Sequence, residues 1–256
     1  MLSKRVIACL DVKDGKVVKG INFENLKELG EPVGLADLYF KQGIDELVFL
    51  DVAASQENRK TMIEVVEKTA EKVFVPMCVG GGISSVSNVL ELLKAGCDKV
   101  SINTSAVIRP KLISEISEKF GSQVITLSVD AKRGDSASGF VITTHGGSKT
   151  STLDALTWIS QAIELGAGEI LLNSIDADGT KAGFDLEMIS AVREVCSVPL
   201  IASGGAGRVE DFSKAIQAGA DAVLAAGVFH TGQITVAEVK AEFSACQIPV
   251  RPNPKL

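Results

Sequence analysis

The stretch VPLIASGGA, residues 198–206, has a counterpart earlier in the chain, VPMCVGGGI at residues 75–83. Each copy is a short apolar run that begins with Val-Pro and ends in glycines. Two further pairs of segments match in the same order and at the same spacing of 123 residues, 43–50 with 166–173 and 95–100 with 218–223. A fourth pair, VIACLD at 6–11 and ITLSVD at 125–130, is 119 residues apart. The sequence therefore predicts two homologous halves, about residues 1–122 and 123–256.

The composition is that of a folded chain with a sizeable core. Of its 256 residues, 46% are hydrophobic and 23% are charged, which excludes a disordered polypeptide. The net charge of −6 argues against non-specific binding to nucleic acid. No apolar run reaches the roughly 20 residues that span a membrane. The first residues, MLSKRVIACLD, lack a signal-peptide pattern, so we expect a cytoplasmic protein.

The sequence gives no support for a metal or a nucleotide cofactor. Its two histidines have no partners at ligand spacing, and its five cysteines are scattered without any CxxC, as expected of reduced thiols in a core. The glycine-rich stretches match neither GxGxxG followed by a ribose-binding acid nor GxxxxGK[ST]. We therefore expect no metal and no cofactor.

Eight short runs rich in Val, Ile and Leu are spread along the chain. Their nearly continuous apolar character is typical of parallel strands covered on both faces. They lie at residues 6–10, 46–50, 75–79, 99–102, 124–129, 169–173, 200–202 and 222–225. Segments with helical spacing lie between them, at residues 61–72, 85–95, 112–120, 153–165 and 209–218.

This alternation predicts an α/β fold, a (β/α)8 TIM barrel with an internal two-fold half-barrel repeat. A doubly wound open sheet is the alternative, and the two-half repeat favours closure. No stretch resembles a linker between domains, so we expect one domain over residues 1–256.

Two aspartates end equivalent strands of the two halves. Asp11 closes the first strand and Asp130 the fifth. In an eight-stranded barrel these strands are opposed, so the two carboxylates are expected to face each other across the mouth, where such barrels have their active sites. Two acids in different surroundings can act as proton donor and proton acceptor. The alternative is that each aspartate caps the loop that follows it.

The glycine-rich strand ends predict anion sites, because glycine lets backbone amides approach an oxyanion. In such barrels the loops after the last two strands commonly hold phosphate. The residues there are Ser203, Gly204, Gly205, Ala226 and Gly227. The repeat predicts a second site from Gly80, Gly81, Gly82, Asn103 and Thr104. Simple turns are the alternative for either loop, whereas two phosphate sites would suit a long substrate with a phosphate at each end.

Two further groups of charged residues are candidates for function. Residues 12–32 predict a mobile lid, in which Lys19 beside Gly20 is the candidate for contact with an anionic ligand. Solvated surface lysines are the alternative. At the opposite end of the strands, charged residues open otherwise apolar runs, and they are Arg5, Glu46, Lys99 and Glu169. They could form a structural layer of ion pairs or a gate.

Five stretches together resemble the HisF family, the cyclase subunits of imidazole glycerol phosphate synthase. They are IACLDVKDGKVVKG (7–20), VGGGI (79–83), DKVSINTSAV (98–107), GAGEILLNSIDADGT (166–180) and IASGGAG (201–207). The resemblance covers essentially the whole chain. It implies a lyase of histidine biosynthesis that condenses ammonia with a phosphoribulosyl formimino aminoimidazole carboxamide ribotide, to give imidazole glycerol phosphate and the aminoimidazole carboxamide ribotide.

The resemblance also assigns roles to residues. It implies that Asp11 and Asp130 are the acid–base pair and that Lys19 is the lysine of the lid. It places phosphate contacts at one end on Gly82, Asn103 and Thr104, and at the other end on Asp178, Gly179, Gly205, Ala226 and Gly227. The family's ammonia gate matches Arg5, Glu46, Lys99 and Glu169. Ammonia is expected from a separate HisH-type glutaminase subunit docked at the N-terminal face of the barrel.

The chain departs from the family pattern at two places. Gly227 stands where a serine is expected, so a backbone contact to phosphate is what remains there. The stretch GGSKTSTLDA (146–155) replaces a loop expected to read closer to GGRKPTGLDA, with Thr150 and Thr152 at its proline and glycine. Two alternatives stay open at this point, the sister ribotide isomerase of the same pathway and a non-catalytic barrel that binds a bis-phosphate.

Overall fold

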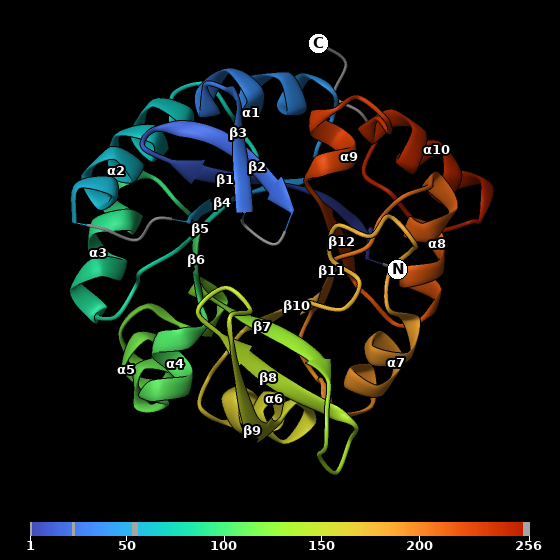
Figure 1. Cartoon of the computed structure of the whole chain (residues 1–256). Coiled ribbons are helices and arrows are strands. Elements are labelled where there is room, and N and C mark those ends of the chain that lie inside the picture. Colours follow the sequence, from blue (N-terminus) through green and yellow to red (C-terminus); the bar gives the residue numbers. More distant parts are fainter. Residues whose placement is uncertain (1, 22–23, 53–55, 253–256) are drawn as a thin grey trace. The chain divides into compact units, whose positions relative to one another are not determined.

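The computed structural model describes residues 2–21, 24–52 and 56–252, and of residues 19–21, 24–27 and 56–61 it describes the backbone. The chain forms two compact units. Figure 1 labels the helices and strands of both. Unit 1 comprises Met1–Ser101 and Ala225–Leu256, and unit 2 comprises Ile102–Leu224.

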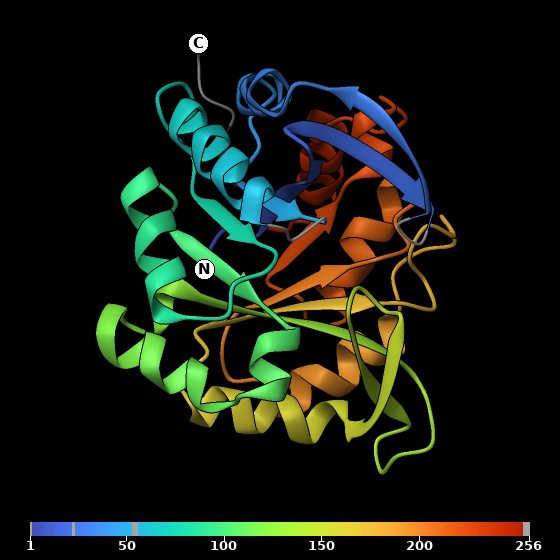
Figure 2. The same ribbon diagram turned by 60° about the vertical axis from the view of Figure 1, so that its left-hand side comes forward.

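In unit 1, four parallel strands pair in the order β1–β4–β5–β6 within the described residues. The antiparallel strands β2 and β3 extend from β1 (Figure 2). The strands are β1 (Arg5–Lys13), β2 (Lys16–Ile21), β3 (Glu24–Gly30), β4 (Glu46–Asp51), β5 (Met77–Gly80) and β6 (Lys99–Ile102). The helices are α1 (Pro32–Lys41), α2 (Gln56–Ala70), α3 (Val86–Ala95), α9 (Gly227–His230) and α10 (Val236–Ala245).

In unit 2, the parallel strands pair in the order β7–β10–β11–β12, and β8 and β9 extend from β7 as antiparallel strands. The strands are β7 (Ile125–Arg133), β8 (Phe140–Thr144), β9 (Lys149–Asp154), β10 (Glu169–Ser174), β11 (Leu200–Ser203) and β12 (Ala222–Ala225). The helices are α4 (Thr104–Ile108), α5 (Lys111–Phe120), the 3-10 helix η1 (Ser122–Val124), α6 (Ala155–Glu164), α7 (Leu186–Val195) and α8 (Val209–Gln217).

All eight predicted strands are present, and the chain has the predicted (β/α)8 barrel fold. The parallel strands are buried along nearly their whole length, which explains their continuous apolar sequences. The helix boundaries follow local chemistry. The Ser85 hydroxyl caps α3 by accepting from the Asn88 amide at 3.2 Å, and Gly96 ends it with a left-handed φ of 107°.

The repeat appears in the element boundaries themselves. Strands β4, β5 and β6 begin 123 residues before β10, β11 and β12, and the members of each pair have the same length. Helices α1 and α6 show the same spacing at both ends, and α3 and α4 begin 123 residues before α8 and α9. The two compact units do not coincide with the predicted halves at 122/123, because their boundaries fall within β6 and β12.

Two antiparallel ribbons were not expected from the sequence. The predicted lid, residues 12–32, contains β2 and β3, and the stretch expected to form a loop at 146–155 contains β9. Thr150 in β9 pairs with Thr143 in β8. Threonine suits a strand and proline cannot donate to a ladder, so the threonine at this position fits the observed pairing. Within the described residues no helix is long and apolar enough to cross a bilayer.

Candidate functional site

Asp130 lies on β7 and accepts hydrogen bonds from two asparagine side chains. Its Oδ2 accepts from Asn103 Nδ2 at 2.8 Å, and its Oδ1 accepts from Asn173 Nδ2 at 3.3 Å. The register of the sheet explains the second contact, because Asn173 on β10 stands directly beside Asp130 on β7. The carboxylate therefore has a fixed orientation with both oxygens engaged.

The surroundings of Asp130 make it titrate near neutral pH. The pKa of this carboxyl is raised to about 6, mainly by burial and also by the Asp178 carboxylate, whereas the amide hydrogen bonds from Asn173 and Asn103 act to lower it. An ordinary aspartate has a pKa of about 3.9. A group with a pKa near 6 can give up and take back a proton at physiological pH, which is what a general acid or base requires.

Asp11 lies on β1 in unit 1 and is 9% exposed. The Cys9 thiol, two residues earlier on the same strand, lies 3.7 Å from Asp11 Oδ1 and can donate a weak hydrogen bond to it. Asp11 and Asp130 thus both occupy buried or half-buried positions near the carboxyl ends of equivalent strands, in different polar surroundings.

The short helices α4 and α9 begin in the same way, although they come from different halves of the sequence. The residue before each helix has an unusual backbone, φ −134° and ψ −90° at Asn103 and φ −122° and ψ −76° at Ala226. Thr104 and Gly227 are the first helical residues. The amides at both helix starts are therefore presented in one repeated geometry, which is suited to an anion.

Thr104 also contacts the turn between β8 and β9. Its Oγ1 accepts from the main-chain amide of His145 at 3.0 Å, and His145 has a left-handed φ of 55°. The His145 ring nitrogen Nδ1 lies 3.0 Å from the Thr144 hydroxyl. Because the Thr104 oxygen already accepts this bond, its own proton remains available to an acceptor.

The segment between β10 and α7, residues 175–185, packs backbone to backbone against the glycines that follow β11. The Gly183 amide donates to the Gly205 carbonyl at 2.8 Å. A Cβ on Gly205 would lie 2.1 Å from the Gly183 carbonyl oxygen, and Gly205 has φ +100°. Within this segment, Asp178 follows a tight turn and Gly179 has φ +75°. Asp178, Gly179 and Gly205 therefore belong to one packed region of unit 2.

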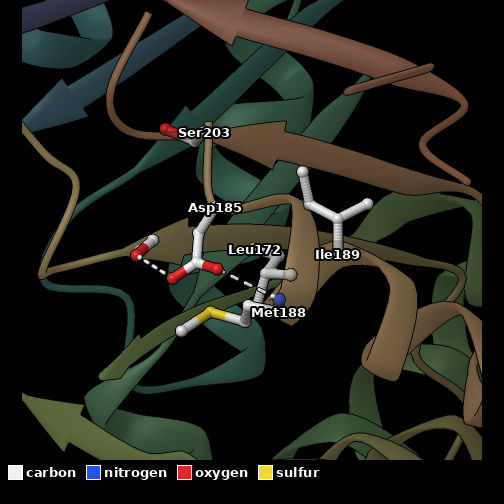
Figure 3. Close-up of a pocket in the computed structure, with 6 residues that line it drawn as sticks. Leu172, Asp185, Met188, Ile189 and Ser203 are labelled. Carbon is white, nitrogen blue, oxygen red and sulfur yellow. Dashed lines mark hydrogen bonds between the residues drawn. The ribbon is translucent and has the colours of Figure 1, made fainter. Parts of the chain in front are cut away.

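Ser203 ends β11 above a small pocket in unit 2 (Figure 3). The other residues that line it are Leu172, Ser174, Asp185, Met188 and Ile189. Asp185 caps α7 by accepting from the Met188 amide at 3.1 Å, as Figure 3 shows. Its carboxylate also accepts from the Ser174 hydroxyl at 3.3 Å.

Gly82 and Lys19, two further predicted site residues, also lie in unit 1. Gly82 follows β5 with φ +61°, and Gly81 before it has φ +102° with the Asp51 carbonyl oxygen 2.3 Å from where a Cβ would be. The backbone of Lys19 belongs to β2, but its side chain lies outside the described part of the chain. The proposed contact of the lysine with substrate therefore stays a prediction.

Three of the four charged residues at the strand starts, Arg5, Glu46 and Lys99, form ion pairs with one another. Glu46 is 1% exposed and accepts from Arg5 at 2.5 Å and from Lys99 at 2.9 Å, so it bridges two cations. In unit 2, Glu169 is also buried and accepts from the Thr126 hydroxyl at 3.1 Å.

A second pocket, of about 340 Å³, lies in unit 1 at the same end of the strands as Glu46. It is lined by residues 73–77 together with Ala70, Gly96 and Asp98. Phe74 on its rim is 76% exposed and lies edge-on to Phe40, with ring centroids 6.0 Å apart.

Two functional candidates were missed from the sequence. Asn173 was noted as part of a strand end, without a role, although it holds Asp130. Arg133, the last residue of β7, carries several ion pairs described below. The relevant signal for Asn173 is its position opposite Asp130 in the sheet register, which appears once β7 and β10 are paired.

Comparison with known proteins adds independent findings. Residues 5–235 match the family model described as "Histidine biosynthesis protein". The chain is 61% identical over 254 residues to the imidazole glycerol phosphate synthase subunit HisF of Thermobifida fusca, with 98% of this chain and 99% of that protein covered. The proteins of the same name from Mycobacteroides abscessus and Nocardioides sp. are 59% and 58% identical, again over 98% of this chain and 99% of theirs.

Proposed function

The chain belongs to the HisF family, the cyclase subunits of imidazole glycerol phosphate synthase in histidine biosynthesis, and we propose that Asp11 and Asp130 carry its acid–base chemistry. The observation that supports this proposal most strongly is the state of Asp130. Two asparagine amides orient its carboxylate, and burial raises its pKa to about 6. The carboxylate can therefore take a proton in one step and return it in another near neutral pH.

In the proposed reaction ammonia condenses with the ketone of the ribulosyl chain, whose oxygen leaves as water, and the imidazole ring closes while the aminoimidazole carboxamide ribotide departs. Ring closure requires protons to be removed from the incoming nitrogen and delivered to the departing one. Asp11 and Asp130 have different neighbours, a thiol for the first and two amides for the second. Carboxyls in unlike surroundings can hold their protons with different strength, so they can divide these two tasks.

We propose that the two phosphates of the substrate bind at the repeated helix starts. One phosphate is held by Gly82, Asn103 and Thr104. The other is held by Asp178, Gly179, Ser203, Gly205, Ala226 and Gly227, with Lys19 covering the bound substrate. The shared backbone geometry before α4 and α9 and the close packing of Gly205 support this assignment. Backbone amides are the main donors, since Gly227 has no side chain to add.

The test is turnover of the phosphoribulosyl formimino ribotide by this chain with ammonium salts as the nitrogen source. We expect imidazole glycerol phosphate and the carboxamide ribotide to form in equal amounts, without any added metal or glutaminase. Binding of the ribotide without turnover would contradict the cyclase function. So would formation of this ribotide from its aminoaldose isomer, which is the reaction of the sister isomerase.

We further propose that a HisH-type glutaminase docks at the N-terminal face and that ammonia passes the cluster of Arg5, Glu46, Lys99 and Glu169. The exposed Phe74 and its pocket lie at this end of the strands in unit 1, where β4 begins with Glu46. Opening such a gate requires an ion pair to move. The side chains of Arg5 and Lys99 are 26% and 17% exposed, against 1% for Glu46, so we expect a cation to move and not the carboxylate.

Phe74→Asp is expected to weaken binding of the glutaminase by roughly 10- to 100-fold, because truncating an aromatic anchor of an interface commonly has effects of this size. Glutamine-dependent turnover should fall with it, while ammonium-dependent turnover stays unchanged. Titration calorimetry and the two assays give the three readouts. Leu38→Asp, which replaces another exposed apolar residue, is the control. Undiminished binding by Phe74→Asp would refute this docking surface, and a complex unable to use glutamine would refute the gate.

A further inference from the structure

Arg133, three residues after Asp130, contacts three carboxylates. Its guanidinium donates to Asp185 at 2.6 and 3.2 Å and to Glu187 at 2.8 Å. It also lies 3.9 Å from Asp176, and its main-chain amide donates to Asp176 at 2.8 Å. The guanidinium lies over the Phe140 ring at 5.5 Å. One side chain thus joins the end of β7 to both ends of the segment 175–185.

This segment carries three aspartates and one lysine, Lys181, in a region that we propose holds phosphate. Asp176 and Asp178 lie near its start, Asp185 lies at its end, and Glu187 follows on α7. Asp178 is near enough to raise the pKa of Asp130. Carboxylates repel a phosphate dianion, so such a site needs a compensating cation. Arg133 pairs with three of these four carboxylates, those of Asp176, Asp185 and Glu187.

The contacts also have a mechanical consequence. Asp185 is the N-cap of α7, and its carboxylate is shared between the helix, Ser174 and Arg133. The segment that it ends contacts Gly205 through the Gly183 amide. Removal of the guanidinium would therefore release the segment at its two ends and take away the positive charge that pairs with Asp176, Asp185 and Glu187.

We propose that Arg133 is a positioning residue for the second phosphate, one that orders residues 175–185 and offsets their negative charge. The proposal rests on the function given above and adds a residue to it. Arg133 acts through Asp176, Asp185 and Glu187, so it is required for substrate affinity and not for proton transfer. Loss of binding that is equal in the ground state and the transition state raises KM and leaves kcat unchanged.

Arg133→Met is expected to raise the KM for the ribotide by roughly tenfold or more, with kcat within about threefold of the wild type. Inorganic phosphate should become a weaker competitive inhibitor by a similar factor. Arg133→Lys keeps the positive charge but cannot make both hydrogen bonds to the Asp185 carboxylate, so its KM should lie between those of the wild type and Arg133→Met. Arg109→Met is the matched control, because Arg109 is similarly exposed and pairs with Glu115 at 2.6 Å. Its KM should equal that of the wild type.

A double variant distinguishes two roles of Arg133, offsetting the negative charge of the segment and holding the segment in place. In Arg133→Met/Glu187→Gln one uncompensated carboxylate is removed, so the KM should fall back part of the way. If Arg133 served only to hold the segment in place through its contacts, the additional loss of the Glu187 carboxylate would not lower the KM again. An unchanged KM in Arg133→Met, or a reduced kcat with no change in KM, would overturn the inference. If the wild type itself fails to turn over the ribotide, the proposed function fails, and inhibition by phosphate is then replaced by direct phosphate binding as the test of Arg133.

Discussion

Asp130→Asn is expected to lower ammonium-dependent turnover by about 10²- to 10⁴-fold, the usual contribution of a general acid or base. Asparagine has nearly the same shape and can still accept from Asn103, while the Asn173 amide can turn over to meet the new NH2 group. What the variant loses is the proton that Asp130 exchanges. The measurement is kcat at saturating ribotide and a fixed concentration of free ammonia, and Asp11→Asn should lose turnover in the same assay.

The pKa of Asp130 gives the sign of the accompanying change in stability. The folded-state pKa, about 6, is higher than the value of about 3.9 for an unfolded chain. The contribution of this carboxyl to stability is therefore fully present below about pH 3.9 and is lost as the pH rises through about 6. At pH 8 the wild type carries a buried charge that the asparagine variant lacks. Asp130→Asn should thus melt at the same temperature or higher at pH 8 while it is inactive.

Lost turnover together with an unchanged or higher melting temperature distinguishes loss of catalysis from misfolding, because a misfolded variant would melt at a lower temperature. Asp135→Asn, an exposed aspartate in the turn that follows β7, is the matched control and should change neither turnover nor melting. The pH profile of kcat/KM for the wild type should show a limb near pH 6 that belongs to Asp130. Activity of Asp130→Asn near that of the wild type would remove Asp130 from the reaction.

The features predicted correctly from the sequence were those in which one local pattern carries the whole signal. The eight parallel strands are continuous apolar runs because both of their faces are covered. The repeat added that strands of the second half stand at positions equivalent to strands of the first. The charged residues opening β1, β4 and β6 were also recognised, and Glu46 does bind Arg5 and Lys99. The single-domain assignment and the roles of the site residues stay predictions.

The features that were missed depend on contacts between residues far apart in the sequence, which no local sequence pattern predicts. Strands β2 and β3 are charged and short, and they form as a ribbon on the end of β1. Asn173 reaches Asp130 because of the register between β7 and β10, and Arg133 meets carboxylates 43 to 54 residues further along the chain. Such contacts arise from the closure of the sheet, so they become visible with the tertiary structure.

Gly205→Ala is expected to destabilise the protein by roughly 3 kcal/mol or more, and so to lower the melting temperature by about 6–12 °C for a chain of this size. The Gly205 backbone has φ +100°, which an alanine adopts only with strain, and its Cβ would lie 2.1 Å from the Gly183 carbonyl oxygen. That oxygen belongs to backbone, and Gly183 also donates to the Gly205 carbonyl, so the two segments would have to separate. The separation moves residues 175–185, and the KM for the ribotide should rise with the loss of stability.

Gly139→Ala separates the effect of backbone conformation from that of the collision. Gly139 also has a positive φ, +78°, but a Cβ there would meet no atom within 4 Å. Its variant should therefore cost about 1–2 kcal/mol, the price of the left-handed conformation, and leave KM unchanged. Thermal melting and ammonium-dependent kinetics on both variants give the comparison. If Gly205→Ala melts no lower than Gly139→Ala, the close approach of Gly183 to Gly205 is not what holds these segments together. If it melts lower and keeps its KM, Gly205 stabilises the fold without contacting the phosphate.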